Sequence, residues 1–312
     1  MSVSGGFLKN TNGTYNILMK IQDFVASLVK KIFVVSRINS LFKNKILLRG
    51  FYDTQNFGYC IRNNSSESLV LFYGDQAVSR GTFINGEFDL FKLVMALSLL
   101  PSKKPSTLLN IGANIGMICI PAIARGFFEN FIAIEPDPEN FKLLRVNTVL
   151  NDLDSQAVLI NSAVGLKKET KTLIRCKTNR GSHKISEPEL GYVDESAITV
   201  EIDSLQGLTS NLATDNLFIV MDVEGYEGYV LEGAKQILQS NPPIMLEFSP
   251  LQLSEESYSL LRDNLINSGY DCYFDLSYEK PQLIKLEKDS LDLLRKNLVC
   301  EKKMTDLLVT KK

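Results

Sequence analysis

Short apolar runs alternate with segments of helical spacing through most of the chain. The runs of strand length are 107–111, 131–134, 157–164, 197–202, 216–221 and 244–248. Several are separated by stretches whose apolar residues recur every three or four positions, including the stretch that ends at Leu150 and the stretch 230–238. Strands that alternate with helices predict an α/β fold with a doubly wound, mostly parallel sheet.

The two ends of the chain have different patterns. Residues 16–37 have helical spacing, 46–85 read as β-rich with 81–84 as a short strand, and 87–100 read as a helix. The apolar face expected for this last helix consists of Phe88, Phe91, Val94, Met95 and Leu99. Segments 269–276 and 281–288 predict an antiparallel hairpin, and about the last twenty residues predict a charged amphipathic helix. We therefore expect an N-terminal extension over 1–85 and a main domain over 86–312.

Composition is that of an ordinary globular protein, with 45% hydrophobic and 22% charged residues among 312. The five cysteines are scattered and form no CxxC pair, which favours reduced thiols over a disulfide framework or a zinc site. No metal site is predicted, and the expected location is the cytoplasm. A net charge of −2 gives no general argument for nucleic-acid binding, and no nucleic-acid partner is expected.

Charge is distributed unevenly along the chain. Residues 1–50 carry eight Lys or Arg against one acid, a net +7, which leaves −9 over the rest. No uncharged run approaches the about 20 residues that a spanning helix needs, and the first residues lack a signal-peptide pattern. The basic amphipathic helix predicted here has three open roles: packing on the main domain, self-association, or peripheral binding to an anionic membrane.

The segment 107–150 predicts a βαβ unit with a ligand site at its strand ends. Gly112 and Gly116 allow the backbone to turn sharply and approach a ligand, and Asn110 and Asn114 flank the turn. Glu135 lies 19 residues after Gly116, close to the roughly 20-residue spacing at which an acid meets ribose hydroxyls. The GxxxG spacing fits GxGxxG poorly, so an adenosine-containing ligand is favoured over a dinucleotide.

Acidic residues end three of the predicted strands, at Glu135, Asp222 and Glu247. Asp222 and Glu224 share one loop, where they can orient a hydroxyl nucleophile, bind a cationic group, or cap the following helix. His183 is the chain's one histidine and lies in a polar loop. It is either a base that titrates near neutral pH or an ordinary surface residue.

Several motifs together resemble the FkbM family of S-adenosylmethionine-dependent methyltransferases. They are LLNIGANIGMICIPA, AIEPDPENFKLLRVNTVLND, IDSLQGL, MDVEGYEGYVLEGAKQIL and PPIMLEF, and they span about residues 86–250 in the family's order. Two positions depart from the family pattern. The first motif usually begins with aspartate where this chain has Asn110, and a lysine is common where it has Met221. An amide can hydrogen-bond to the cofactor's ammonium group, but it cannot pair with it by charge.

The resemblance implies a class I Rossmann-like fold and methyl transfer to an oxygen, with a small-molecule or glycan hydroxyl as the acceptor. By the same resemblance, the loop of Asn110, Gly112, Asn114 and Gly116 holds the methionine part of S-adenosylmethionine, and Glu135 holds its ribose. Ser162 and Ala163 lie near the adenine, and Asp222 lies beside the methyl group or the acceptor. Asp222, Glu224 and His183 are the candidate catalytic residues. The alternatives are a nicotinamide-dependent oxidoreductase and a non-catalytic tethering protein with a degenerate cofactor pocket.

Overall fold

We describe the fold from a computed structural model of the chain. It describes residues 58–100, 105–186, 196–214 and 216–312, two short helical pieces at 48–49 and 52–53, and the backbone of 32–34. The predicted N-terminal amphipathic helix lies mostly outside these residues. Within it, however, Ile32–Val34 form a short strand, β1, so the helix prediction is wrong there.

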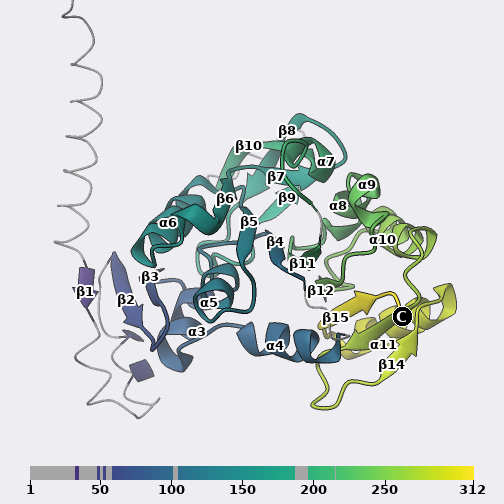
Figure 1. Cartoon of the computed structure of the whole chain (residues 1–312), viewed down its shortest axis with the longest axis horizontal. Helices are drawn as coiled ribbons and strands as arrows, with labels where there is room; N and C mark the ends of the chain where they lie inside the picture. Colours follow the sequence, from purple (N-terminus) through teal and green to yellow (C-terminus); the bar gives the residue numbers. More distant parts are fainter. Residues whose placement is uncertain are drawn as a thin grey trace, which may run out of the picture.

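The centre of the described part is an eight-stranded sheet (Figure 1). In spatial order its strands are β14 (Leu283–Lys285), β13 (Cys272–Asp275), β15 (Thr305–Thr310), β12 (Ile244–Phe248), β11 (Leu217–Met221), β4 (Thr107–Ile111), β5 (Asn130–Ile134) and β6 (Ala157–Ile160). The five strands from β12 to β6 run parallel, whereas β15 is antiparallel to both of its neighbours. Strands β13 and β14 form the predicted antiparallel hairpin. The predicted doubly wound, mostly parallel sheet is therefore confirmed.

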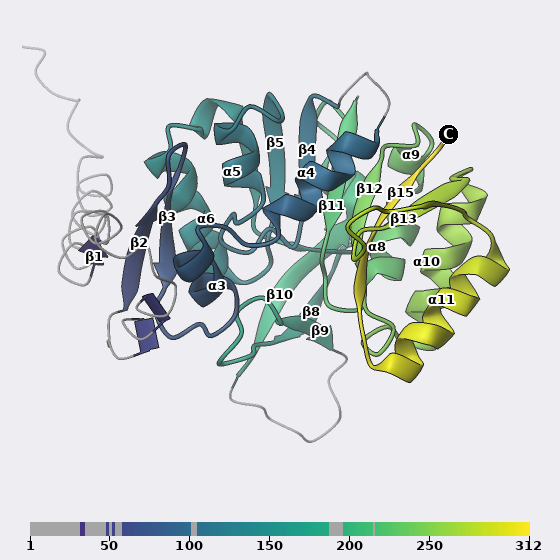
Figure 2. The ribbon, with the colours of Figure 1, turned by 90° about the horizontal axis from the view of Figure 1, so that it is seen from below.

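Helices cover both faces of this sheet (Figures 1 and 2). One face carries α4 (Leu90–Leu99), α5 (Cys119–Ala124) and α6 (Pro138–Leu150), and the other carries α7 (Leu205–Leu208), α8 (Glu227–Glu232), α9 (Lys235–Leu238), α10 (Glu255–Asn267) and α11 (Lys288–Glu301). Successive residues of a strand point to opposite faces. Leu108 accordingly packs in the core of the first group, and its neighbour Leu109 in that of the second.

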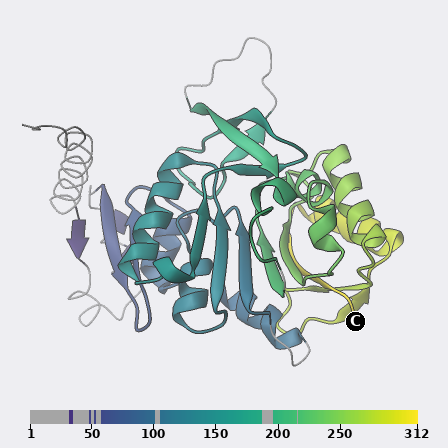
Figure 3. The ribbon, with the colours of Figure 1, turned by 45° about the horizontal axis from the view of Figure 1, so that its top comes forward.

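A second, four-stranded sheet is built from the segment between β6 and β11, as Figure 3 shows in green. Its strands are β7 (Ala163–Gly165), β10 (Ala197–Ser204), β8 (Glu169–Ile174) and β9 (Lys184–Ser186). The single strand predicted over 157–164 divides at Asn161, because β6 stays in the central sheet while β7 pairs with β10.

The described part of the N-terminal extension packs onto the main domain. Strands β2 (Tyr59–Asn63) and β3 (Ser68–Phe72) pair with each other and confirm the β-rich prediction there. Leu71 and Phe83 belong to the same apolar core as Leu108 of β4, so the described extension shares the main core. The division into 1–85 and 86–312 stays a prediction. Among the described residues, we find no helix with the length and apolar character needed to span a bilayer.

The short strand predicted at 81–84 is wrong, because these residues lie in helix α3 (Val78–Asn85). The flanking residues explain the difference. The Asp75 carboxylate accepts hydrogen bonds from the backbone N–H groups of Ala77 and Ser79, which satisfies donors at the start of the helix. Gly86 ends the helix in the left-handed region, with φ of 89°. These end signals outweigh the strand propensity of the run.

The apolar face predicted for α4 is also wrong in part. Phe91 and Val94 are 54% and 43% exposed, whereas the helix buries Leu90, Leu93, Ala96 and Leu97. The sequence of this helix is apolar nearly all round, so two faces satisfy the same spacing. Only packing against the sheet selects between them.

The charged C-terminal helix predicted from the sequence ends early. Helix α11 stops at Glu301, and Thr305–Thr310 form the buried strand β15 between β12 and β13. Lys302 breaks the helix in the left-handed conformation, with φ of 52°. A segment as short as this one, with apolar residues only at 307–309, can be strand or helix by periodicity alone, and its pairing with distant strands decides here.

Two asparagines join the extension to the main domain: Asn147 in α6 and Asn151 directly after it. The Asn147 amide accepts from Val70 N at 2.7 Å and donates to Val70 O at 3.2 Å and Ile115 O at 2.7 Å. Asn151 makes an equivalent pair with the backbone of Ser68. These two side chains hydrogen-bond to the backbone of β3, as a neighbouring strand would. Asn147 also donates to Ile115 O in the glycine turn.

We predict that Asn147→Ala lowers the free energy of unfolding by about 2–4 kcal/mol, because three buried backbone groups lose their partner. Urea unfolding of the full chain measures it. Arg145→Ala, an exposed position on the same helix, is the control and should change the value by less than about 0.5 kcal/mol. A similar small change in both variants would contradict the bridging role of Asn147.

Candidate functional site

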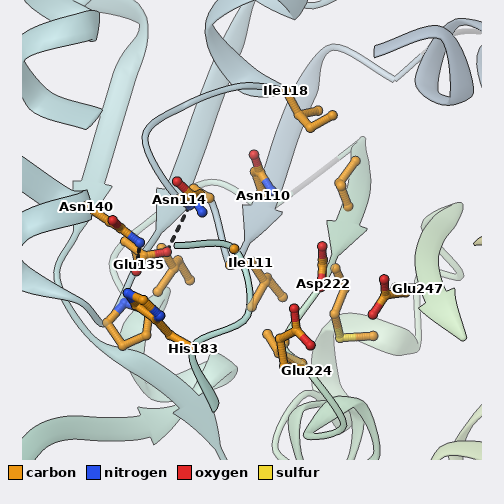
Figure 4. A pocket seen from close by; sticks show the side chains of 18 of the residues that line it. Asn110, Ile111, Asn114, Ile118, Glu135, Asn140, His183, Asp222, Glu224 and Glu247 are labelled. Carbon is orange, nitrogen blue, oxygen red and sulfur yellow. Dashed lines mark hydrogen bonds between the residues drawn. The ribbon is translucent and has the colours of Figure 1, made fainter. Parts of the chain in front are cut away.

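An open cavity lies at the carboxyl ends of the parallel strands (Figure 4). Such strand ends are where open α/β sheets bind their ligands. The cavity brings together nine of the ten residues assigned a binding or catalytic role from the sequence: Asn110, Gly112, Asn114, Glu135, Ser162, Ala163, His183, Asp222 and Glu224. The small sheet closes one side through Leu173 and Ile185. Gly116 is not among the lining residues.

The two glycines of the turn meet different steric demands. Gly112 has φ of +78°, and a Cβ there would lie 1.9 Å from the backbone oxygen of Asp222. This close approach lets the loops after β4 and β11 meet at the cavity floor. Gly116 has φ of +94°, and its Cβ would lie 2.7 Å from Cγ1 of Ile120. Gly116 thus serves the packing of the turn against α5 and α6.

Glu135, at the end of β5, is hydrogen-bonded to the glycine turn. It is 5% exposed, and its Oε2 accepts from Asn114 N at 2.8 Å while Oε1 accepts from Asp137 N at 2.9 Å. Asn114 adopts φ of 52°, an uncommon conformation for a residue other than glycine. Burial raises the pKa of Glu135 to about 7, against the opposing effect of these hydrogen bonds.

The polar loop 177–183 lies over the Glu135 end of the cavity. The carbonyl oxygen of Arg180 accepts from the side-chain amides of Asn114 and Asn140, at 3.0 and 3.1 Å. The Arg180 guanidinium donates to Asn140 Oδ1 and Glu139, and it stacks on the ring of Phe72 at 3.7 Å from the centroid. The extension, the turn and the small sheet therefore hold this loop in place together.

His183 lies at the same end, beside Asn140 and Glu135 in Figure 4. Its Nδ1 accepts from the backbone N–H of Cys176 at 3.1 Å, so the neutral ring carries its proton on Nε2. Nε2 has no hydrogen-bond partner among the described residues and lies 4.0 Å from Asp137 Oδ2. Burial lowers the pKa of His183, and nearby Arg180 adds to this effect, so the neutral form is favoured.

The opposite end of the cavity is acidic. Asp222 follows β11, Glu224 lies two residues further on with φ of 55°, and Glu247 lies in β12. One carboxylate oxygen from each residue lies within 4.8 Å of the other two. Asp222 is accessible to solvent through the cavity, yet the protein around it and the charge of Glu247 raise its pKa well above the usual value. Burial likewise raises the pKa of Glu247, to about 8, and that of Glu224.

Three more charged residues stand near this end, and no sequence motif marked them. Asp306 of β15 pairs in register with Glu247, and Asp89 precedes α4; both line the cavity. Lys92 bonds to both, at 2.6 Å from Asp306 and 3.1 Å from Asp89. The strand at Asp306 was predicted as helix, and this hid its position opposite Glu247.

Asn110 stands on the cavity wall between the glycine turn and the acidic end. It is 2% exposed, and its Oδ1 has no hydrogen-bond partner among the described residues. A buried amide oxygen without a partner is costly, so a ligand or water in the cavity is the expected partner. Asn110 pairs in register with Val220, which places it on the same face of the sheet as Asp222.

The cavity suits a nucleoside that carries a cationic group. Glu135 offers carboxylate oxygens of the kind that accept from ribose hydroxyls, and apolar side chains such as Pro136 and Val164 flank Ser162 and Ala163. The carboxylates at the far end favour positive charge. The residues present therefore fit S-adenosylmethionine, whose sulfonium and ammonium groups are cationic.

Comparison with protein families identifies one match. The profile of the methyltransferase FkbM domain matches residues 110–272, more than half of the chain. The matched segment includes β11, the acidic loop after it, and β12. A comparison with curated proteins gives no match.

Solved methyltransferase structures are similar at low identity. Precorrin-6y C5,15-methyltransferase from Geobacter metallireducens has 12% identity and a TM-score of 0.37, over 70% of this chain and 87% of that one. M. jannaschii TYW2 in complex with AdoMet has 13% identity and a TM-score of 0.38, over 83% and 89%. The M. jannaschii tRNA m1G37 methyltransferase has 12% identity and a TM-score of 0.39, over 83% and 56%.

The raised pKa of Glu135 predicts a pH dependence of stability. Between the ordinary value of 4.5 and about 7, the folded state keeps a proton that the unfolded state releases, so the free energy of unfolding falls as pH rises. Glu135→Gln should flatten this fall by about 1–3 kcal/mol across the same window. Urea unfolding at a series of pH values measures both proteins. If the free energy of unfolding changed with pH in the same way in both proteins, this pH dependence could not be assigned to Glu135.

Proposed function

The chain belongs to the FkbM family of S-adenosylmethionine-dependent methyltransferases, and we propose that it methylates a hydroxyl oxygen of a sugar, glycoconjugate or related natural product. The observation that carries the proposal is the cavity with a ribose-type carboxylate, Glu135, at one end and three carboxylates at the other. The Glu135 carboxylate matches the ribose of a nucleoside donor. The three carboxylates can take the proton of a hydroxyl group that accepts the methyl.

We assign the donor side of the cavity residue by residue. Glu135 accepts from the ribose hydroxyls, and Ser162 and Ala163 border the adenine. Asn110, Gly112 and Asn114 face the methionine part, and the unpartnered Oδ1 of Asn110 supports this role. Gly116 shapes the turn without touching the ligand, in keeping with its contact to Ile120. When bound, S-adenosylmethionine supplies an activated methyl group on a sulfonium.

The acceptor side rests on Asp222 and Glu224. In-line transfer requires an aligned oxygen and a group that takes its proton. Asp222 opens onto the cavity, and its raised pKa brings it closer to the range of a useful proton acceptor. Burial raises the pKa of the Glu224 carboxyl, and neighbouring Gln252 and Ser182 oppose that rise. A catalytic role for His183 stays a prediction. Its occupied Nδ1 favours a part in holding the loop over the donor.

The charge of the cavity favours an acceptor without phosphate groups. Asp89, Asp222, Glu224, Glu247 and Asp306 all line it. Nucleic-acid binding draws most of its affinity from cationic contacts to phosphates, and this wall offers the opposite charge. A neutral, hydroxyl-rich molecule meets no such repulsion.

Family membership also weighs against the two alternatives. A nicotinamide-dependent oxidoreductase would be expected to have the GxGxxG turn, which this chain replaces with GxxxG. A degenerate pocket would be expected to lack the residues that face the donor. In this chain Glu135 lines the cavity and accepts hydrogen bonds from Asn114 N and Asp137 N.

We predict that Glu135→Ala weakens binding of S-adenosylmethionine at least tenfold. A charge-assisted hydrogen bond contributes about 1.5–3 kcal/mol, and the variant also frees the Asn114 N–H. Calorimetry with the full chain measures the dissociation constant. Glu129→Ala, an exposed acid before β5, is the control and should bind like the wild type. Equal binding by Glu135→Ala and the wild type would remove the ribose role.

We further predict that Asp222→Asn reduces methyl transfer by about 10²–10⁴-fold while S-adenosylmethionine binding changes only a few fold. The amide keeps the size of the side chain but loses most of its ability to accept a proton. Transfer of tritium from labelled donor into a glycan or glycolipid extract measures the rate, and calorimetry measures binding. An undiminished rate would contradict the role of Asp222.

A further inference from the structure

We propose that the segment 72–78 of the N-terminal extension raises the affinity for S-adenosylmethionine, by positioning the loop 178–181 on the donor side of the cavity. Arg180 is the positioning residue. The segment runs from the end of β3 to the first residue of α3, and both of its ends belong to the apolar core that the extension shares with the main domain. The inference rests on the assignment of Glu135 to the donor ribose, and the methyl acceptor takes no part in it.

Hydrogen bonds join the backbone of the loop to this segment. Asp75 Oδ1 accepts from Arg180 N at 3.3 Å, and Gln76 N donates to Thr178 O at 2.8 Å. Asp75 is 3% exposed, and the same carboxylate accepts from the backbone at the start of α3. The loop is therefore bonded to a part of the extension that is itself held by hydrogen bonds.

The Arg180 side chain adds an aromatic contact to these hydrogen bonds. Its guanidinium carbon lies 3.7 Å from the centroid of the Phe72 ring, which is within the range of a cation–π interaction. The loop also approaches α3 closely, because a Cβ at Gly181 would lie 2.8 Å from Cγ2 of Val78. Phe72 is not among the residues that line the cavity, so its ring can affect a ligand there only through the loop.

Two side-chain amides connect the loop to the donor side of the cavity (Figure 4). The Arg180 carbonyl oxygen accepts from Asn114 and Asn140, and Arg180 Nε donates to Asn140 Oδ1 at 3.0 Å. The backbone N–H of Asn114 in turn donates to Glu135 Oε2 at 2.8 Å. A displacement of the loop would therefore alter the surroundings of the carboxylate assigned to the ribose.

The contacts of the Arg180 guanidinium indicate that it acts by position. The group is directed to Asn140, Glu139 and the ring of Phe72. We therefore assign Arg180 to holding the loop rather than to direct contact with the donor. Polar groups that are held in place before a ligand arrives lower the cost of ordering them on binding. The extension thus contributes to donor affinity although Phe72 and Asp75 lie outside the cavity wall.

Calorimetry with S-adenosylmethionine and the full chain tests the proposal. Arg180→Ala should weaken binding by about tenfold or more, because it removes a charge-assisted hydrogen bond and the contact with the ring. Arg180→Lys keeps the charge but not the planar group, and it should weaken binding by about threefold or more. Phe72→Leu keeps an apolar side chain without the aromatic face, and it should weaken binding by about two- to tenfold. In the Arg180→Ala background, Phe72→Leu should have little further effect, since the two residues act through one contact.

Two matched variants serve as controls. Arg145→Ala and Phe91→Leu change an exposed arginine of α6 and an exposed phenylalanine of α4, and both should bind like the wild type. Equal thermal unfolding midpoints would exclude misfolding, and Arg180→Lys leaves the apolar core intact if Phe72→Leu destabilises it. A second measurement needs no donor: amide hydrogen exchange over 176–184 should be faster in Arg180→Ala and Phe72→Leu than in the wild type.

Equal dissociation constants for the wild type and Arg180→Ala would overturn the proposal, and so would unchanged hydrogen exchange in the loop. Wild-type binding by Arg180→Lys would overturn it because charge alone would then suffice. Weaker binding by Arg180→Ala but not by Phe72→Leu would also overturn it, since Arg180 would then act on the donor directly. The titration contains no acceptor, and Glu135→Ala tests the ribose role separately. Failure of the positioning role and failure of the proposed function therefore give different results.

Discussion

The hydrogen bonds of one buried carboxylate connect the main parts of this molecule. Glu135 ends β5, and its two oxygens accept from the backbone of the glycine turn after β4 and of the segment that leads into α6. A buried carboxylate is costly unless it is hydrogen-bonded, and these bonds offset part of that cost. The same oxygens face the cavity. A ribose diol would therefore meet a carboxylate that its surroundings already hold in position, which reduces the ordering needed on binding.

Asparagine side chains extend this network outward from Glu135. Asn114 and Asn140 both donate to the carbonyl of Arg180, which fixes the loop over the cavity. Asn147 joins the glycine turn to β3 of the extension. Amides can donate and accept at once, so each links two backbone segments that are not neighbours in a sheet. The extension is thus coupled to the donor side of the cavity, although it contributes few residues to its wall.

Much of the fold followed from local sequence patterns, and two of the errors share one cause. The strands around the glycine turn and β11 were predictable because each is a buried run that stops at a turn or an acid. The exposed face of α4 and the strand β15 were not, because both depend on partners distant in the sequence. The site shows the same division. Glu135 and Asp222 end strands and could be recognised, whereas Asp306 became visible only when β15 was placed beside Glu247.

The neutral residue at position 110 and the acidic wall can be explained together. Asn110 lies on the same face of the sheet as Asp222, where burial and then the neighbouring acids already raise the pKa of Asp222. A further carboxylate in this position would add repulsion to a group of acids that lacks cationic partners among the described residues. An amide contributes an oxygen without that charge. The family's usual aspartate would attract positive charge at this point of the turn; in this chain the carboxylates that can do so lie at the ends of β11 and β12. Positive charge is still favoured in the cavity, but toward the end formed by Asp222, Glu224 and Glu247.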